Sequence, residues 1–453
     1  MPMISRRSVL ASTSSVVASV AVGRGAEAQL ERGDATRVAD TDALVQATGN
    51  PAVTAIVING QLTDVPQIRL RPGQTLTGQN GGELHFGRGV DGLCVSADNI
   101  VSNLGLFASP DKRAIFNDTD VASLGRVRLA QLIATGQVQI LARDRLRDGH
   151  VEVSGLHIDA AVTRDRAERP KGYGVELLQG AFTLWNQQDD PATRITANLA
   201  GLSAGRAEAP VIGSGILVAG TGPAGGTVEA DLIETGTVHS DGKIPPGTHD
   251  RITAAVFVAD GVRVGAVRNS GPLTTYGAND MVLDNWGGVG QWTVTAPMSS
   301  FGPSGTGFAN FGTISRLQVQ AAIETRGLGA RGFNTYAGTL ELSEFERIVT
   351  HADGAVGLQI GCPIGRVLVR NGIETFGAAG PSLVKGALVR LPATALSVTP
   401  TGSAREITVY GGLKAHGPAM PSLEILGPVD RLLVETKAAG RADDPGPAQR
   451  PLP

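Results

Sequence analysis

The sequence predicts an all-β protein built as a solenoid of stacked coils, and three observations support this prediction. Glycine accounts for 61 of the 453 residues, which is roughly double its average usage. Hydrophobic residues reach 42% while aromatic residues reach only 4%, a mixture that suits a narrow core filled by small and branched side chains. The third observation is a repeat in the second half of the chain. This composition excludes a helical bundle, because glycine is too frequent within the apolar stretches. It also excludes a disordered chain, since apolar residues are plentiful and the net charge is only −3.

The repeat has a step of 25 residues and consists of a short polar motif that follows an apolar residue. Its copies are Thr275-Tyr276-Gly277, Ser300-Phe301-Gly302, Thr325-Arg326-Gly327, Thr350-His351-Ala352 and Thr375-Phe376-Gly377. A second motif, in which a small and an apolar residue precede a glycine, keeps the same step through residues 282–361. Three short strands per repeat with glycine at the corners are typical of one coil of a β-solenoid. Successive coils would then stack about 4.8 Å apart, the spacing of neighbouring strands in a sheet.

The second motif continues upstream at steps of about 40 residues, in segments 174–180, 215–220 and 255–261. We therefore expect each of these coils to carry an insertion, with candidates at residues 189–209, 221–226 and 240–247. Insertions on one edge of a solenoid commonly form its binding face.

The N-terminus predicts export from the cytoplasm. Residues 1–28 are expected to be a twin-arginine-type signal peptide, because Ser5-Arg6-Arg7-Ser8-Val9-Leu10 is similar to the twin-arginine consensus. Ala26-Glu27-Ala28 fits the small-x-small rule for signal cleavage. We expect a periplasmic or secreted protein with no stable membrane insertion after cleavage. An uncleaved anchor is the alternative, although the apolar stretch is short for a membrane span.

The rest of the chain divides into three parts. Residues 29–50 are expected to form an N-terminal capping segment with a short helix over residues 42–48, and residues 51–436 the solenoid domain. Residues 437–453 are rich in Ala, Gly, Pro and charge, and we expect disorder there. Within the domain, the spacing of apolar residues over 121–135 predicts a helical insertion.

Two segments near the start of the domain carry a resemblance to a known family. The first is Leu70-Arg71-Pro72-Gly73-Gln74-Thr75-Leu76-Thr77-Gly78, and the second runs from Asp98-Asn99 to Asn103-Leu104. They resemble the opening coils of the right-handed parallel β-helix proteins of the pectin-lyase-like superfamily, and the pattern extends over roughly residues 50–435. The resemblance implies a right-handed parallel β-helix, a polysaccharide lyase, hydrolase or epimerase, and a homo-oligomer, often a trimer in this superfamily. The Gly-His-Gly, Trp-x-Asp-His and Asp-Pro-His-Asp signatures of its enzyme families are absent, so no named activity transfers.

The alternation of side chains along the strands places one charged cluster on the outside of the coils. We expect Glu324, Arg326, His351 and Glu374 to be the catalytic residues. Glu324 and Glu374 lie two coils apart, about 9–10 Å between backbones, which suits the two carboxyl groups of an inverting glycosidase. Arg326 or His351 would equally serve a lyase. The alternative is a solvated face held by weak ion pairs.

A second outward row brings aromatic and polar side chains together. Trp286, Phe311 and Tyr336 would form a flat stripe that suits the face of a sugar. The other expected substrate-binding residues are Tyr276, Asp280, Asp284, Arg331, Asn334 and Asp353. The alternative is a stack covered by a neighbouring loop or subunit. Facing inward, Asn285 and Asn310 are expected to form an amide ladder, and Leu383 to continue a row of core residues.

Composition and residue spacing limit the classes of ligand that we expect this chain to bind. Cys94 and Cys362 are isolated in sequence and expected to be buried thiols, and no spacing of Cys and His residues indicates a metal. We therefore expect no metal and no cofactor. A pI near 6.2 without a basic run disfavours nucleic acid. The expected partner is a polysaccharide or oligosaccharide, which the chain binds and cleaves as a hydrolase or lyase. A non-catalytic, adhesin-like or envelope-structural solenoid is the alternative that the sequence leaves open.

Overall fold

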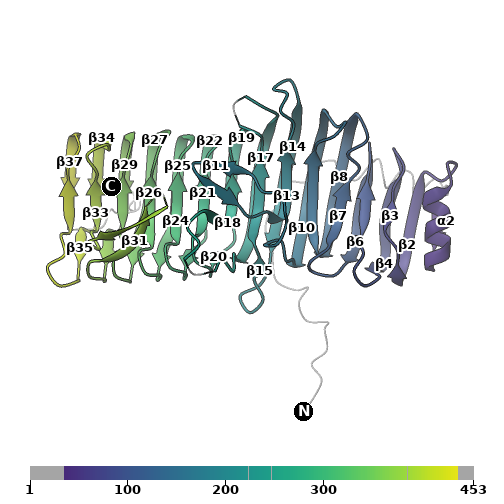
Figure 1. The fold of residues 1–453 in the computed structure, drawn as a ribbon, viewed down its shortest axis with the longest axis horizontal. Helices are drawn as coiled ribbons and strands as arrows, with labels where there is room; N and C mark the ends of the chain where they lie inside the picture. Colours follow the sequence, from purple (N-terminus) through teal and green to yellow (C-terminus); the bar gives the residue numbers. More distant parts are fainter. Residues whose placement is uncertain (1–34, 223, 246, 385, 437–453) are drawn as a thin grey trace, which may run out of the picture.

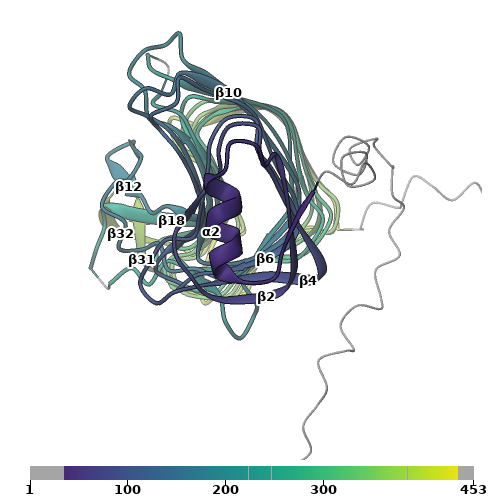
Figure 2. The same cartoon turned by 90° about the vertical axis from the view of Figure 1, so that its right-hand side faces the viewer.

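The computed structural model describes residues 35–436, except residues 223, 246 and 385. The expected signal peptide (1–28) and disordered tail (437–453) lie outside the described residues. The described chain is nearly all-β, and its strands lie side by side along one long axis (Figure 1). Seen along that axis, the coils superimpose as one closed outline (Figure 2).

Two long parallel sheets form the walls of this stack. The larger sheet has 20 strands: β1 (Thr36–Val38), β2 (Ala55–Val65), β4 (Thr75–Phe86), β6 (Ile100–Phe107), β8 (Ser123–Thr135), β10 (Asp148–Ala160), β14 (Arg194–Ala204), β15 (Val211–Ile212), β17 (Thr227–Asp241), β19 (Val262–Asn269), β20 (Leu273–Thr275), β22 (Gly288–Val294), β23 (Met298–Ser300), β25 (Thr313–Thr325), β27 (Thr339–Thr350), β29 (Pro363–Val369), β30 (Ile373–Thr375), β34 (Ser403–Val409), β35 (Leu413–Ala415) and β37 (Val429–Val434).

The second sheet has 15 strands: β3 (Ile68–Arg69), β5 (Leu93–Val95), β7 (Arg113–Asn117), β9 (Gln137–Ala142), β11 (Lys171–Gly172), β12 (Val175–Leu177), β13 (Gly180–Asn186), β16 (Ser214–Ala219), β18 (Arg251–Val258), β21 (Asp280–Asn285), β24 (Thr306–Asn310), β26 (Arg331–Thr335), β28 (Leu358–Ile360), β33 (Leu396–Val398) and β36 (Leu423–Ile425). A separate antiparallel hairpin pairs β31 (Gly380–Val384) with β32 (Ala387–Leu391).

Strand register follows the repeat in the sequence. In the larger sheet, Met298 pairs with Leu273 on one side and with Ile323 on the other, 25 residues away in each direction. In the second sheet, Phe308 pairs in the same way with Leu283 and Phe333. These six side chains are fully buried in one continuous apolar core. The larger sheet turns a corner of the coil, because its long strand β25 pairs with both β22 and β23.

The core also contains the expected amide ladder. Asn285 and Asn310 are fully buried, and the Nδ2 of Asn285 donates to the Oδ1 of Asn310 at 2.8 Å. Such side-chain ladders satisfy buried polar groups between stacked coils.

The expected capping helix is confirmed as α2 (Thr41–Gly49). Asp40 caps its N-terminus by accepting a hydrogen bond from the backbone of Ala43. Leu44 and Ala47 are buried in the main core, and the helix lies across the end of the first coils (Figure 2).

The helix predicted over residues 121–135 is wrong, because this segment is strand β8, which pairs with β6 and β10. Val127 and Leu129 alternate inward, as do Leu132 and Ala134, all in the core. Between these pairs Gln131 adopts a φ of 52°, which shifts the alternation by one residue. The segment therefore contains two runs in which every second residue is apolar, offset by one residue, and together these runs have the apolar spacing of a helix.

The expected insertions are only partly correct. The described residues within 205–210, 221–226 and 242–250 leave the sheets, but the candidate 189–209 contains β14, a regular strand paired with β10 and β17. Two hairpins that the sequence did not reveal, β11–β12 and β31–β32, are the larger additions to the coil.

These hairpins also displace one expected copy of the second motif, at residues 174–180, and one predicted core position, Leu383. Val175 lies in β12, and the equivalent place in the core row is taken by Phe182, which pairs with Ile216. Leu383 lies in β31 rather than in the core, where Leu396 takes its place opposite Leu358.

Candidate functional site

Both hairpins project from the same side of the stack (Figure 2). The first is anchored by parallel pairing of β12 with β18, and its two-residue turn, Tyr173-Gly174, has φ angles of 49° and 82°. Such paired positive φ angles are typical of type I′ turns. The second is anchored where the Oγ of Ser382 donates to the carbonyl of Gly329 at 2.8 Å.

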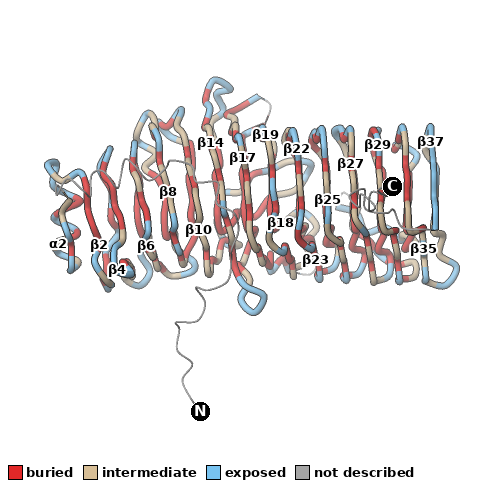
Figure 3. Tube along the Cα trace, turned by 180° about the vertical axis from the view of Figure 1, so that it is seen from behind, coloured by how far each residue is buried: buried red, intermediate tan, exposed pale blue. Residues whose placement is uncertain are grey.

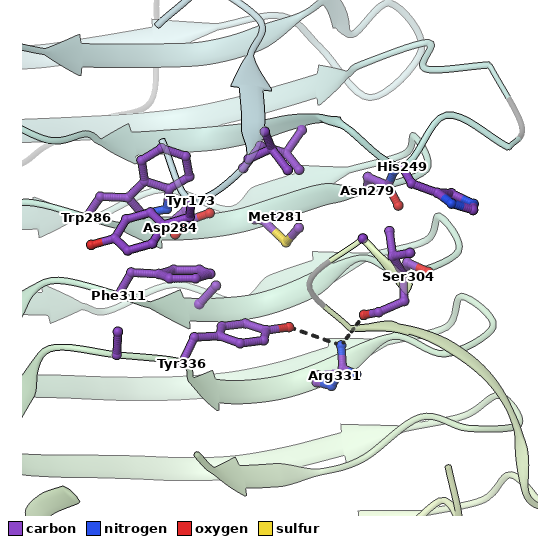
Figure 4. A pocket seen from close by; sticks show the side chains of 16 residues that line it. Tyr173, His249, Asn279, Met281, Asp284, Trp286, Ser304, Phe311, Arg331 and Tyr336 are labelled. Carbon is purple, nitrogen blue, oxygen red and sulfur yellow. Dashed lines mark hydrogen bonds between the residues drawn. The ribbon is translucent and has the colours of Figure 1, made fainter. Parts of the chain in front are cut away.

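The hairpins and the outer face of the second sheet enclose a cavity of about 200 Å3. Figure 4 shows its side chains converging from both hairpins, from the loop before β18 and from β21, β24 and β26. The lining residues are Tyr173, Val175, His249, Ile252, Asn279, Met281, Asp284, Trp286, Ser304, Ala309, Phe311, Arg331, Tyr336, Ala337, Leu383 and Gly386. Five of the expected substrate-binding residues therefore meet at one cavity: Asp284, Trp286, Phe311, Arg331 and Tyr336.

The aromatic row points away from the solenoid core, as expected, but it is not exposed. Phe311 stacks on Tyr336 with ring centroids 4.6 Å apart, and Trp286 meets the edge of Phe311 at 5.8 Å. Tyr173, from the first hairpin, packs against Trp286 at 5.0 Å and against Phe311 at 4.6 Å. Trp286 is consequently only 4% exposed. The first hairpin therefore covers Trp286, whereas Phe311 and Tyr336 remain partly exposed along the cavity.

Asp284 is the most unusual side chain of the cavity. It is 1% exposed, and neither of its carboxyl oxygens has a hydrogen-bond partner among the described residues. Phe257 is its neighbour in the strand register. Burial in these surroundings raises the pKa of Asp284 well above its ordinary range, because an apolar environment penalises the charged form.

Arg331 is as buried as Asp284, but its side chain is a cation. It is 1% exposed, and its guanidinium donates to the hydroxyl of Tyr336 at 3.2 Å, the carbonyl of Leu383 at 3.2 Å and the Oγ of Ser382 at 2.8 Å. All three acceptors are neutral, and the Nε has no partner among the described residues. Within the described chain, Arg331 is a buried cation that forms no ion pair. Such a charge is costly without a counter-ion.

Two more expected substrate-binding residues are buried near the cavity without lining it. Asn334 is 1% exposed and shares a row with Asp284 across Ala309. Asp280 is fully buried as the first residue of β21, where its Oδ2 accepts from the backbone of Gly242 at 3.1 Å and of Gly277 at 3.3 Å. Desolvation outweighs these hydrogen bonds and raises the pKa of Asp280 to about 8.

The four expected catalytic residues lie at a different place, on an exposed corner of the coils, and none of them lines the cavity. Their register is as predicted, because Glu324 pairs with Val349 and Val349 with Glu374. They form two separate ion-paired groups. Glu324 Oε1 contacts His351 Nε2 at 2.8 Å and also binds Arg326.

Glu374 belongs to the second group, with Arg347 at 2.9 Å and His416 at 3.2 Å. Burial raises the pKa of Glu374, but the hydrogen bond from His416 and the charge of Arg347 outweigh it, so the net pKa is lowered. Glu374 is therefore an ionised, ion-paired carboxylate.

Tyr276 and Asp353 lie at the same corner. The Tyr276 ring stacks on Phe301 at 5.5 Å, and further along the corner His351 stacks on Phe376 at 5.4 Å. Since the ring faces contact one another, mainly ring edges are left for a ligand, which is a poor platform for a sugar face. Asp353 accepts a hydrogen bond from the backbone of Ala378 at 2.7 Å.

Sequence reasoning missed Tyr173 and Leu383, which the hairpins contribute, and His249, which comes from the loop before β18. A signal for the first hairpin was present, because Gly172-Tyr173-Gly174 is a turn sequence next to a β-branched residue. Nothing in the local sequence of Leu383 distinguishes a hairpin from a coil strand.

Both cysteines are buried, as expected. Burial raises the pKa of Cys94 to about 11, and the thiol of Cys362 contacts the carbonyl of Ala337 at 3.4 Å.

Over residues 35–436, apart from the three undescribed positions, no cluster of His, Cys, Asp and Glu has the arrangement of a metal site. In the same part of the chain, no helix has the length and apolar character needed to cross a membrane. Searches for similar proteins among family models, curated proteins and solved structures find no match to this chain.

Proposed function

We propose that this chain is an exported, right-handed parallel β-helix protein with coils of about 25 residues that binds an extracellular polysaccharide or oligosaccharide and cleaves it as a hydrolase or lyase. The observation that supports this proposal is the cavity beneath the two hairpins, where stacked aromatic rings, a buried acid and a buried arginine line one space. Apolar walls with a few convergent polar groups are typical of ligand sites.

The size of the cavity favours a single sugar residue. Its volume of about 200 Å3 is below the roughly 300–1,000 Å3 of most small-molecule sites. A hairpin stands at each side, so a terminal or branch residue fits this space better than the middle of a chain. The aromatic rings would contact the C–H face of the sugar.

Asp284 is suited to be the general acid. Its raised pKa keeps a proton on the carboxyl group at pH values where an ordinary aspartate has lost it. The proton passes to the glycosidic oxygen as its bond to carbon breaks. His249 lies across the cavity from Asp284 in Figure 4. It would accept a proton from the attacking water in a hydrolase, or from the sugar carbon next to a carboxylate in a lyase.

Arg331 favours an acidic sugar. A carboxylate or sulfate on the ligand would supply the counter-ion that the described chain does not provide to this buried guanidinium. A neutral sugar would leave the charge uncompensated. We therefore expect acidic saccharides to bind more tightly than neutral ones of the same length.

The exposed corner with Glu324 and His351 is the second candidate for the catalytic site, because a carboxylate and an imidazole contact each other there at 2.8 Å. Both groups are about one-third exposed and already paired. They lie outside the cavity, so they would act on a chain bound along the corner.

The test is turnover of acidic and neutral polysaccharides by the purified chain, followed through reducing ends and through absorbance at 235 nm for unsaturated uronates. The variants are Asp284→Asn and Arg331→Gln, with Glu324→Gln as the matched control on the corner. We expect Asp284→Asn to lose product formation, Arg331→Gln to lose the preference for acidic substrates, and Glu324→Gln to stay active.

Activity that survives in Asp284→Asn but is lost in Glu324→Gln would move the catalytic site to the corner. Binding without any product would favour the non-catalytic, adhesin-like solenoid. The absence of both binding and product on all substrates would contradict the proposal.

A further inference from the structure

The last coil of the stack leaves the solenoid core open. In the row of core residues along the second sheet, Leu358 and Leu396 are fully buried, whereas Leu423 in β36 is 38% exposed. In the larger sheet, Val409 is fully buried and its partner Val434 in β37 is 39% exposed. These residues have the position and chemistry of the core, but within the described part of the chain no further coil covers them.

We name this surface the end face. It consists of six large apolar residues, each 37–60% exposed: Leu423, Ile425, Leu426, Leu432, Leu433 and Val434. Figure 3 shows β37 as a mostly exposed strand beside well-buried neighbours. On one side β37 pairs with β34, and among the described residues no strand pairs with its other side. The N–H and C=O groups on that open edge are available to another strand.

The opposite end of the stack is closed. There, α2 lies over the first coils (Figure 2) and buries Leu44 and Ala47 in the core. A second copy of the chain therefore cannot continue the stack head to tail, because its own first coil is covered by its helix. Two end faces can meet only tail to tail, which gives a closed pair rather than a growing fibre.

We propose that the end face is a dimer interface at which two copies of this chain pair tail to tail. A second copy presents the same apolar row and the same open strand edge, so each would complete the core of the other. The segment that follows β37 is a poorer cover, because residues 437–453 contain Leu452 as their one large apolar side chain.

The charges of Arg431 in β37 and of Glu435 directly after it are complementary in such a pair. A two-fold axis through Leu433 makes the two β37 strands antiparallel and places Arg431 directly opposite Glu435 of the second copy, twice. The same register sets Leu432 opposite Val434 of the second copy, so apolar side chains face one another on the core side. Within one chain, Arg431 lies 3.6 Å from Glu406. It does not meet Glu435 of its own chain, because residues four positions apart in an extended chain are about 13 Å apart.

This register yields a charge-exchange test by sedimentation equilibrium on the full-length purified chain. Wild type is expected to dimerise at micromolar concentration. Arg431→Glu or Glu435→Arg alone should weaken the dimer about tenfold or more, which corresponds to about 1.4 kcal/mol. The double variant should restore most of the affinity, because opposite charges again face each other across the axis.

Leu432→Asp should give a monomer, whereas Ile133→Asp should stay dimeric, since Ile133 is 52% exposed on β8, far along the chain from the end face. Circular dichroism of each variant verifies that the fold is retained. A wild-type monomer at 100 micromolar, or a dimer insensitive to Leu432→Asp, would overturn the proposal. Dimerisation that appears only when residues 437–453 are removed would overturn it too, because it would show that the chain's own tail occupies the end face.

Discussion

Replacing Asp280 with asparagine tests the electrostatics of the buried corner beside the cavity. Asp280 is fully buried, and burial raises its pKa from the ordinary 3.8 to about 8. Asparagine keeps the shape and one carbonyl oxygen that accepts from Gly242 and Gly277, but it carries no titrating proton. The variant should therefore change the pH dependence of stability.

The magnitude follows from the difference in pKa between the two states. Below about pH 4 the carboxyl is protonated in both the folded and the unfolded chain, so its ionisation does not affect folding. As the pH rises, the unfolded chain releases the proton while the folded chain retains it until about pH 8. Folding is penalised by about 1.4 kcal/mol per pH unit over this window, or about 6 kcal/mol in total, and the penalty is constant at higher pH.

The assay is urea unfolding of wild type and Asp280→Asn at several pH values from 4 to 9. The variant should gain stability relative to wild type between pH 4 and pH 8, and the difference should level off above pH 8. Asp353→Asn is the matched control, because Asp353 is exposed and also accepts a backbone hydrogen bond. Parallel stability curves for wild type and Asp280→Asn would show that the folded chain does not hold the proton of Asp280 over this pH range.

Three further predictions follow from buried groups. Asp284→Asn should unfold at higher urea concentration than wild type above pH 5, since the raised pKa of Asp284 penalises folding as the pH rises; an unchanged unfolding midpoint at pH 8 would contradict this. Asn310→Ala should lower the free energy of unfolding by about 1–3 kcal/mol, because it leaves the amide of Asn285 without its acceptor. Equilibrium urea unfolding measures this loss, and an unchanged free energy of unfolding would show that the ladder does not stabilise the fold. Cys94, with a pKa of about 11, should resist a thiol reagent at pH 8 in the folded chain and react fully in urea; rapid labelling of the folded chain would show that the site is open.

The repeat allowed the stack to be predicted from the sequence. Positions such as Met298 and Phe308 recur at a fixed step, and hydrogen bonding between successive coils turns that step into strand register. Even the buried pair Asn285 and Asn310 was visible, because two polar residues recur in an apolar row. A repeat in the sequence therefore predicts a fold of repeated coils.

The cavity could not be predicted because the two hairpins that close it are not periodic. Each hairpin occurs once, so Tyr173 and Leu383 have no copy one coil away that would reveal their role. Extrapolating the step through the second hairpin placed Leu383 in the core, where Leu396 is found. The sequence predicted that the side chain of Trp286 points away from the solenoid core. Its burial, however, depends on Tyr173, which lies more than one hundred positions earlier in the chain.

The proposed cavity has a direct consequence for the products of the reaction. If one sugar residue at a chain end enters it, cleavage of an acidic polysaccharide should release a single residue or a short end product from the first minutes onward. Mass spectrometry of early time points, with Asp284→Asn as the inactive reference, measures this directly. We expect one small, acidic product that accumulates while the long chains shorten slowly. An early ladder of medium-length fragments, or the same products from Asp284→Asn, would contradict it.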